Sequence, residues 1–137
     1  MSNGNVVQPK SMTTFIGLMV IFIGISGCFS VLFGAWLAHA GQSLAANTQQ
    51  SMATALQYQL FHTLALFLCI LWAKCLGASK LMFSACICFS LGILCFSGTI
   101  YIKSIFEISW IGKMTPIGGI LFALAWLMLA LEGKNNL

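Results

Sequence analysis

The side chains of this chain that could do chemistry are two histidines, two tyrosines and a few amides and hydroxyls. Tyr58 and His62 are four residues apart, and Gln59 lies three residues before His62, so we expect these three to share one face of a helix. An imidazole beside a phenol and an amide can bind a polar solute, relay a proton or ligate a haem iron. The candidate polar site consists of His39, Tyr58, Gln59, His62, Thr63, Ser97, Thr99, Tyr101 and Thr115.

Other kinds of chemistry have little support in the composition. The two acidic residues are Glu107 and Glu132, so the chain has no aspartate and no Ser-His-Asp constellation. Two histidines suffice for axial haem ligation but are too few for a structural zinc site, which needs four ligands. The six cysteines lie within or beside apolar runs, where cysteine behaves as a small apolar residue. We therefore expect a non-enzymatic protein without a metal site or a resident cofactor.

The elements that must position these groups follow from the composition. Of the 137 residues, 60% are hydrophobic and only 6% are charged, whereas soluble domains average about 45–50% apolar and about 25% charged residues. There is too little polar surface to cover a soluble globule, so we predict an integral membrane protein with the lipid bilayer as its partner. The net charge of +4 comes from lysines scattered between apolar runs. Nucleic-acid binding needs a clustered basic face, so we exclude nucleic acid as a partner.

The apolar runs predict four membrane-spanning helices, because a bilayer core about 30 Å thick requires about 20 helical residues. The predicted helices cover about residues 14–39, 55–74, 81–102 and 115–132, within a single domain of residues 14–132. Residues 1–13 form a polar N-terminal tail, residues 133–137 a C-terminal tail, and the uncharged segment 41–54 an interfacial loop. Thr115 followed by Pro116 marks the start of the last helix.

Short linkers make neighbouring helices antiparallel, so the predicted fold class is an all-α, antiparallel four-transmembrane-helix bundle. Loops rich in lysine stay in the cytoplasm. Four lysines (10, 74, 80 and 134) flank one side of the predicted bundle, and two lysines (103 and 113) flank the other. This difference predicts that both termini are cytoplasmic. The candidate polar site then falls in the outer half of the bundle.

Three interpretations of the polar cluster stay open, and one of them is a haem or metal site. A polar group without a partner in hydrocarbon costs several kcal/mol, so we expect these side chains to point inward and to bond to one another. They can serve only as contacts between helices, worth about 0.6 kcal/mol each on average, or they can form a ligand or proton site. Small residues let helices approach closely in lipid. The residues expected to serve helix packing are Gly98, Pro116, Gly118 and Gly119.

Four segments of the chain together resemble a known family. They are FGAWLAH (33–39), ALQYQLFHTLAL (55–66), LCFSGTIY (94–101) and TPIGGILFALAW (115–126), and in this order and spacing they are similar to the domain-of-unknown-function 423 family. The first segment departs from the family at Trp36 and Leu37, where members usually carry an aromatic residue followed by glycine. The resemblance implies a multi-pass, four-helix protein of the bacterial inner (plasma) membrane without an assigned activity.

Three functions follow as hypotheses. We predict a small integral membrane protein that acts as a non-catalytic structural or accessory module, within a homo-oligomer or a larger membrane complex. One alternative is a small transporter or channel that uses the polar site in the outer half of the bundle. A second alternative is a haem- or quinone-binding redox protein that uses His39 and His62.

Overall fold

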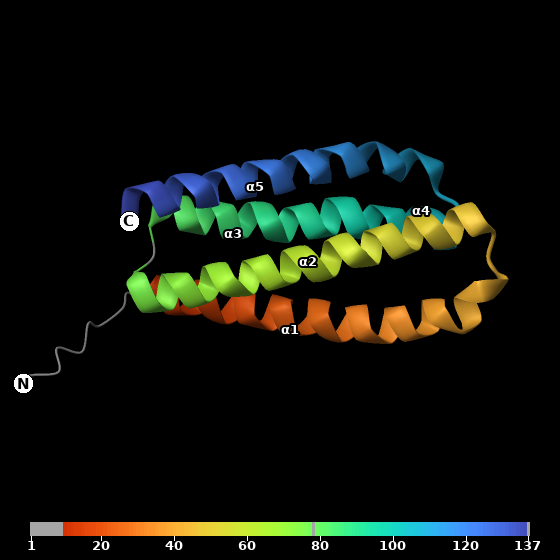
Figure 1. The fold of residues 1–137 in the computed structure, drawn as a ribbon, viewed down its shortest axis with the longest axis horizontal. Helices are drawn as coiled ribbons and strands as arrows, with labels where there is room; N and C mark the ends of the chain where they lie inside the picture. Colours follow the sequence, from red (N-terminus) through yellow and green to blue (C-terminus); the bar gives the residue numbers. More distant parts are fainter. Residues whose placement is uncertain (1–9, 78, 137) are drawn as a thin grey trace, which may run out of the picture.

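The computed structural model describes residues 10–77 and 79–136, which form a bundle of long antiparallel helices (Figure 1). The α-helices are α1 (Lys10–Ala38), α2 (Ala46–Leu76), α3 (Lys80–Ile93), α4 (Thr99–Phe106) and α5 (Thr115–Asn136). A π-helical segment, η2 (Leu94–Gly98), joins α3 to α4 without a break, and two 3₁₀ turns, η1 (Ala40–Ser43) and η3 (Ser109–Met114), lie between the spans. The start of α1 and the C-terminus of α5 lie at the same end of the bundle (Figure 1).

Within the described residues, four stretches are long and apolar enough to cross a membrane. They are Ser11–Ala38, Ala46–Leu76, Lys80–Phe106 and Ser109–Lys134, and they contain 26 to 31 residues each. About 20 helical residues suffice to cross the hydrocarbon core, so each stretch can span it, with residues to spare at the interfaces. The predicted all-α fold with four transmembrane helices is confirmed.

The helices are longer than the hydropathy predicted. The expected loop at 41–54 is wrong for most of its length, because η1 begins at Ala40 and α2 already starts at Ala46. The hydroxyls of Ser51 and Thr54 each donate to the backbone carbonyl four residues earlier, at 2.9 Å. The hydroxyl side chains of this polar segment therefore form their hydrogen bonds within a helix. Local polarity alone does not distinguish such a helix from a loop.

The other helix ends shift in the same direction. The first helix begins at Lys10, so residues 10–13 of the expected tail are helical, while residues 1–9 of that tail lie outside the described residues. The third span continues past residue 102 to Phe106 and ends at Glu107, whose φ of 56° is left-handed and stops the helix. The last helix continues past residue 132 to Asn136, and Leu137 is not described.

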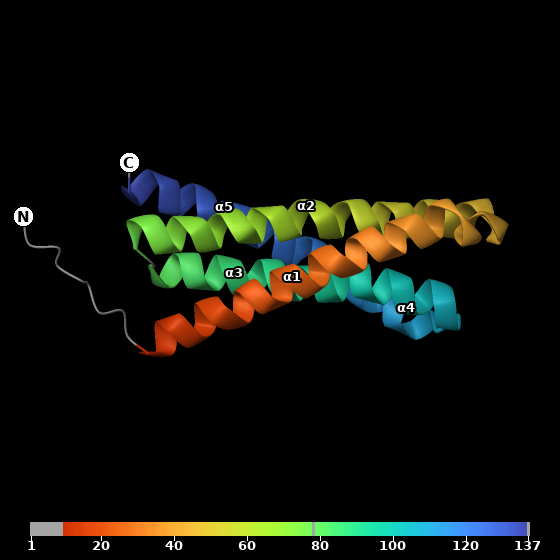
Figure 2. The ribbon, with the colours of Figure 1, turned by 90° about the horizontal axis from the view of Figure 1, so that it is seen from below.

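Two apolar clusters fill the bundle. The larger cluster lies between α2, α3 and α5 and includes Leu66, Ile70, Phe89 and Phe122. The smaller cluster joins α1 to α2 and α4 through Phe33, Leu37, Met52, Ala55 and Tyr101. Figure 2 shows α1 crossing the other helices obliquely. Only 17% of its apolar window is buried, so most of that window faces outward. These outward apolar side chains suit a lipid environment, where they cost nothing to expose.

A close contact between helices brings α5 against the π-helical segment. A Cβ built on Gly118 would lie 2.4 Å from the backbone nitrogen of Phe96, so only glycine fits there. The packing role expected of Gly98 and Gly119 is wrong, because a Cβ at either position would meet no atom within 4 Å. Pro116 is exposed in the first turn of α5, where proline starts a helix rather than packs against a neighbour.

Candidate functional site

A buried hydrogen-bond network ties three of the spans together, and we call its members Ser26, Gln59, Thr63 and Tyr101 the Gln59 network. The amide nitrogen of Gln59 on α2 donates to the carbonyl and the hydroxyl oxygens of Ser26 on α1, at 3.2 and 3.1 Å. The Tyr101 hydroxyl on α4 donates to the Gln59 amide oxygen at 3.0 Å. The hydroxyls of Ser26 and Thr63 are 2.7 Å apart and share a hydrogen bond.

Helical spacing explains how these side chains meet. Gln59 and Thr63 are four residues apart on α2, and so they project toward the same neighbour, α1. Ser26 and Ser30 are likewise four apart on α1, and the Ser30 hydroxyl donates to the Ser26 carbonyl at 2.8 Å. The sequence-based site omits both serines. Two hydroxyl residues four apart in an otherwise apolar run were the available signal.

His62 and Tyr58 face a different neighbour from Gln59, so the expectation that the three share one face is wrong. The His62 ring stacks on Phe122 of α5 with ring centroids 3.6 Å apart and an angle of 11° between the planes. The Tyr58 ring stacks on Phe96, with centroids 4.6 Å apart. Successive helix residues are rotated by about 100°, so Gln59 points well away from Tyr58. Because α2 has neighbours on both sides, this rotation sends the two groups to different helices.

His62 keeps one ring nitrogen available. Its Nδ1 lies 2.7 Å from the Tyr58 carbonyl oxygen, an acceptor, so Nδ1 carries the hydrogen and Nε2 is left as an acceptor. A small pocket of about 270 Å³ opens beside the ring, lined by Gln57, Tyr58, Phe61 and His62. The arrangement can accept a hydrogen bond from a hydroxyl that approaches from the lipid side.

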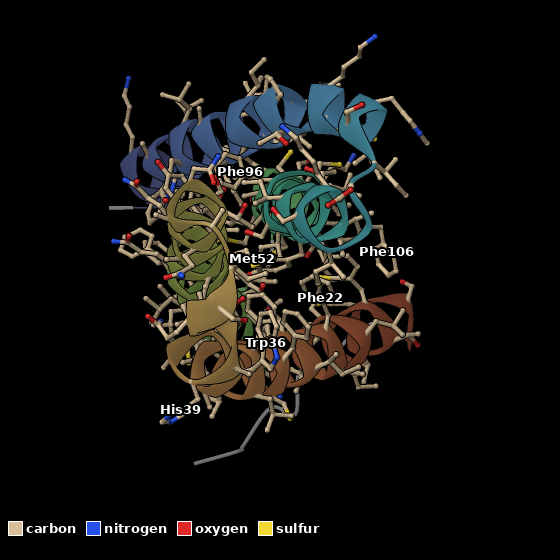
Figure 3. The ribbon with its side chains drawn as sticks, turned by 90° about the vertical axis from the view of Figure 1, so that its right-hand side faces the viewer. Phe22, Trp36, His39, Met52, Phe96 and Phe106 are labelled. Carbon is tan, nitrogen blue, oxygen red and sulfur yellow. The ribbon has the colours of Figure 1, made fainter. Side chains whose placement is uncertain are left out.

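His39 does not join His62. It lies just after α1, is exposed, and precedes η1 without a side-chain hydrogen bond to that turn. Figure 3 views the bundle end-on and shows His39 at its outer edge, while Met52 points toward the interior. The structure therefore does not place the two imidazoles together for shared ligation of a haem iron.

The remaining predicted residues make separate contacts between helices. The Ser97 hydroxyl, fully buried in the π-helical segment, donates to the carbonyl of Ala55 on α2 at 2.7 Å. The hydroxyls of Thr99 and Thr115 are 2.8 Å apart and link α4 to α5. The Thr99 hydroxyl also lies 2.6 Å from the backbone carbonyl oxygen of Cys95, four residues earlier, and donates to it. The predicted cluster is thus several local contacts rather than one site.

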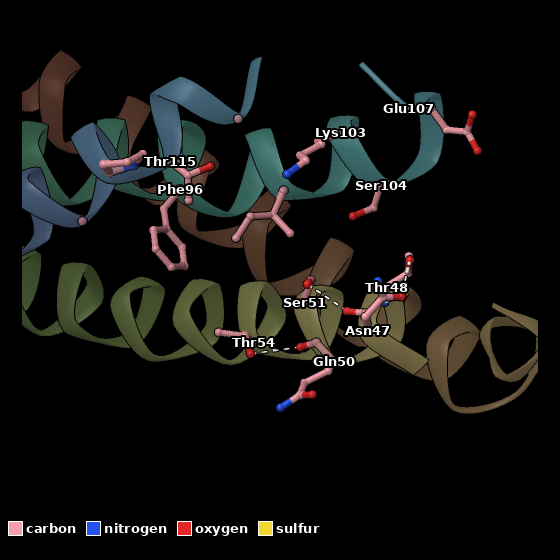
Figure 4. Close-up of a pocket in the computed structure, with 14 residues that line it drawn as sticks. Asn47, Thr48, Gln50, Ser51, Thr54, Phe96, Lys103, Ser104, Glu107 and Thr115 are labelled. Atoms are coloured by element: carbon pink, nitrogen blue, oxygen red, sulfur yellow. Dashed lines mark hydrogen bonds between the residues drawn. The ribbon is translucent and has the colours of Figure 1, made fainter. Parts of the chain in front are cut away.

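A polar cleft of about 1000 Å³ opens between the first turns of α2, the end of α4 and the start of α5. Figure 4 shows it in close-up, with Ser51 and Thr54 on one wall and Lys103 and Ser104 on the other. Of the predicted site residues, only Thr115 lines it. Sequence reasoning missed the cleft because it treated the first turns of α2 as a loop. The lining residues are Asn47, Thr48, Gln50, Ser51, Thr54, Phe96, Ile100, Lys103, Ser104, Glu107, Gly112, Thr115, Pro116 and Gly119.

The part of the chain that the structure describes contains no cluster of side chains that could ligate a metal ion. No group of three or more His, Cys, Asp or Glu side chains there is close enough to hold a metal ion. Among the described residues, no buried side-chain nitrogen or oxygen lacks a hydrogen-bond partner. The buried polar groups consequently bond within the protein.

Comparison with known proteins identifies similar sequences. Residues 33–119 match the family described as "Protein of unknown function (DUF423)". The UPF0382 membrane protein YwdK of Bacillus subtilis is 32% identical over 122 residues, which cover 88% of this chain and 98% of that protein. The UPF0382 inner membrane protein YgdD of Escherichia coli K12 is 32% identical over 112 residues, covering 81% of this chain and 85% of YgdD. A UPF0382 membrane protein of Haemophilus influenzae is 37% identical over 109 residues, covering 79% of this chain and 86% of that protein. No solved structure matches the chain.

Proposed function

The chain belongs to the DUF423 family of small bacterial membrane proteins, and we propose that it works as a non-catalytic membrane module, a rigid helical unit that assembles with copies of itself or with other membrane proteins. It is a multi-pass protein of the bacterial inner membrane, as its four apolar spans and the name of its relative YgdD indicate.

The observation that carries the proposal is the Gln59 network. The side-chain amide of Gln59 forms hydrogen bonds with Tyr101 and Ser26, with donor–acceptor distances of 3.0 to 3.2 Å. All four members of the network are at most 6% exposed. Polar groups arranged in this way hold helices in a fixed register, because separating the helices would leave several of them without partners in hydrocarbon.

A transport function would need a different arrangement. A pathway for a polar solute or a proton requires polar groups that face an open path through the bundle. Here Gln59 and Thr63 bond toward α1, whereas His62 stacks on Phe122 of α5. The space between α2, α3 and α5 is filled by apolar side chains such as Leu66 and Phe89, both fully buried. These contacts favour a static module over a transporter.

Native purification tests the proposal. The tagged full-length protein is extracted with its surrounding lipid into polymer nanodiscs, and its mass is measured by native mass spectrometry. We expect a defined assembly larger than the 14.8 kDa chain, with a constant ratio of subunits. A lone monomer at every protein concentration would contradict the module, as would solute flux in proteoliposomes that Gln59→Leu abolishes.

A second candidate function rests on His62. An acceptor nitrogen at the edge of an aromatic pocket suits a flat ring that carries hydroxyl groups, and a membrane-soluble quinol has such a ring. The Nε2 atom would accept a hydrogen bond from the quinol hydroxyl, and the rings of Tyr58 and Phe61 line the pocket. This proposal needs His62 alone and no contribution from His39.

Quinone extraction tests this second candidate. The protein is purified from quinone-replete membranes, extracted with solvent, and the extract is analysed by absorbance and mass spectrometry. We expect quinone in a fixed molar ratio to protein, lost in His62→Leu and retained in the exposed control His39→Leu. Equal quinone in both variants, or none in the unmodified protein, would contradict the assignment.

A further inference from the structure

The polar cleft between α2, α4 and α5 lies at the end of the bundle opposite the start of α1 and the end of α5 (Figures 1 and 4). Its walls differ in character. Hydroxyl side chains such as Ser51, Thr54 and Ser104 supply polar lining, while Phe96 and Ile100 supply apolar lining. A ligand that fits such a cleft has a polar head and an apolar body.

The cleft holds one cationic and one anionic side chain, Lys103 and Glu107, both on or directly after α4. The Lys103 chain lies over Gly112, where an added Cβ would come within 3.2 Å of the lysine Cδ, and Figure 4 shows it extended along the cleft. Although the two residues are four apart, the structure records no ion pair between them among the residues it describes. Figure 4 shows the Glu107 carboxylate turned away from Lys103, so each charge remains available to an external group.

We propose that this cleft binds the head group of a zwitterionic phospholipid that carries a primary ammonium, such as phosphatidylethanolamine. The Lys103 ammonium and the Ser104 hydroxyl donate hydrogen bonds to the lipid phosphate. The hydroxyls of Ser51 and Thr54 already donate within α2, so they contribute only acceptor oxygens to the cleft. The Glu107 carboxylate accepts hydrogen bonds from the lipid ammonium. The glycerol and the first acyl carbons lie against Phe96 and Ile100. This site goes beyond the proposed module function and does not depend on it.

A membrane lipid fits this position better than a soluble phosphate compound. Exposed aromatic side chains mark the membrane interface, and Phe106 and Trp110, next to the cleft, are 67% and 69% exposed. Lysines at the ends of transmembrane helices reach the depth of lipid phosphates. The two opposite charges match a head group with both signs, whereas an anionic head group would place no cation beside Glu107.

Lipid binding to the purified full-length protein tests the proposal. Delipidated protein is titrated with phosphatidylethanolamine, phosphatidylcholine or phosphatidylglycerol in mixed micelles, and bound lipid is counted by native mass spectrometry. We expect phosphatidylethanolamine to bind at least about fivefold more tightly than the other two, because phosphatidylcholine has no N–H to donate and phosphatidylglycerol has no cation. Soluble glycerophosphoethanolamine forms a further arm, and we expect it to compete poorly.

Charge variants assign the two contacts. Lys103→Gln should weaken the binding of all three phospholipids by about tenfold. Lys113 is an exposed lysine in η3 that does not line the cleft, so Lys113→Gln should change their binding by no more than about twofold. Glu107→Gln should remove the preference for phosphatidylethanolamine over phosphatidylcholine and leave phosphatidylcholine binding unchanged. Equal effects of the two lysine variants would overturn the proposed site and would show that Lys103 only contacts the membrane interface.

A steric variant tests the cleft without changing its charge. Gly119 lines the cleft, and a Cβ built there would meet no atom within 4 Å, so the Gly119→Leu side chain starts in open space and occupies part of the cleft. Gly133→Leu makes the same change in open space at the other end of α5. We expect Gly119→Leu to lower phosphatidylethanolamine binding by about tenfold and Gly133→Leu to leave it intact. Unaltered binding in Gly119→Leu, or glycerophosphoethanolamine that competes as well as the lipid, would overturn the proposal.

Discussion

The Tyr101 hydroxyl on α4 donates a hydrogen bond to the Gln59 amide oxygen on α2, and the Gln59 amide nitrogen donates onward to Ser26 on α1. One buried amide therefore connects three of the four spans. The amide oxygen meets a donor, and the amide nitrogen meets acceptors. This connection makes the register of α1, α2 and α4 specific in a membrane, where apolar side chains alone do not favour protein contacts over lipid.

Gln59→Leu should lower the free energy of unfolding by about 1–3 kcal/mol, because Tyr101 loses its acceptor and Ser26 loses a donor. Tyr101→Phe removes a single bond and should cost less, about 0.6–1.7 kcal/mol. The measurement is unfolding of the purified protein in mixed micelles titrated with a denaturing detergent. Gln57→Leu is the matched control, since Gln57 is exposed on the same helix. A loss in Gln57→Leu equal to that in Gln59→Leu would contradict the role of the network.

Gly118→Ala and Gly119→Ala should have opposite effects although the residues are adjacent. A methyl group at Gly118 would collide with the backbone of Phe96 and Cys95, so the helices must separate, at a cost of about 1–3 kcal/mol. At Gly119 the methyl group meets open space, and replacing a helical glycine should raise stability by up to about 1 kcal/mol. The same unfolding titration measures both variants. Equal stabilities would show that α5 does not approach η2 closely.

Ser79→Ala should destabilise the start of the third span. The Ser79 hydroxyl donates to the Glu132 carboxylate at 2.5 Å and accepts a hydrogen bond from the Met82 backbone N–H at 3.0 Å. Loss of this N-cap should cost about 1 kcal/mol or more. Ser84→Ala is the control, because the exposed Ser84 hydroxyl bonds only to the carbonyl of Lys80 in its own helix. Hydrogen exchange of the first turn of α3 should rise in Ser79→Ala and stay unchanged in Ser84→Ala.

Cysteine labelling should establish the orientation that the lysine distribution predicts. Cys75 is exposed at the end of α2 that lies beside the start of α3, and Ser43 is exposed at the opposite end of the bundle. If the termini are cytoplasmic, a membrane-impermeant maleimide labels Cys75 in inside-out vesicles, and Cys75→Ser removes that signal. A cysteine introduced by Ser43→Cys should be labelled from the outside of intact cells or spheroplasts. The reverse pattern would show that the bundle is inserted the other way.

The amino-acid sequence by itself determined the fold class. Four apolar runs of bilayer length and the near absence of charge leave little choice, because a backbone in hydrocarbon must satisfy its hydrogen bonds within helices. It also indicated most of the candidate polar side chains that are buried: Gln59, His62, Thr63, Ser97, Thr99 and Tyr101 are all at most 6% exposed, whereas His39 and Tyr58, which were expected to point inward, are exposed. Hydropathy was less informative at the helix ends. The polar turns at 46–54 belong to α2, where hydroxyl side chains donate hydrogen bonds to backbone carbonyls of the same helix.

Only the tertiary structure decided which partner each polar side chain meets. Neighbouring positions such as Tyr58 and Gln59 project about 100° apart, and the sequence does not say which helix stands in each direction. The arrangement of α1 and α5 on different sides of α2 sends Gln59 to Ser26 and His62 to Phe122. The same arrangement makes glycine necessary at Gly118 but not at Gly119, and it brings Lys103 and Ser51, far apart in the sequence, to one cleft.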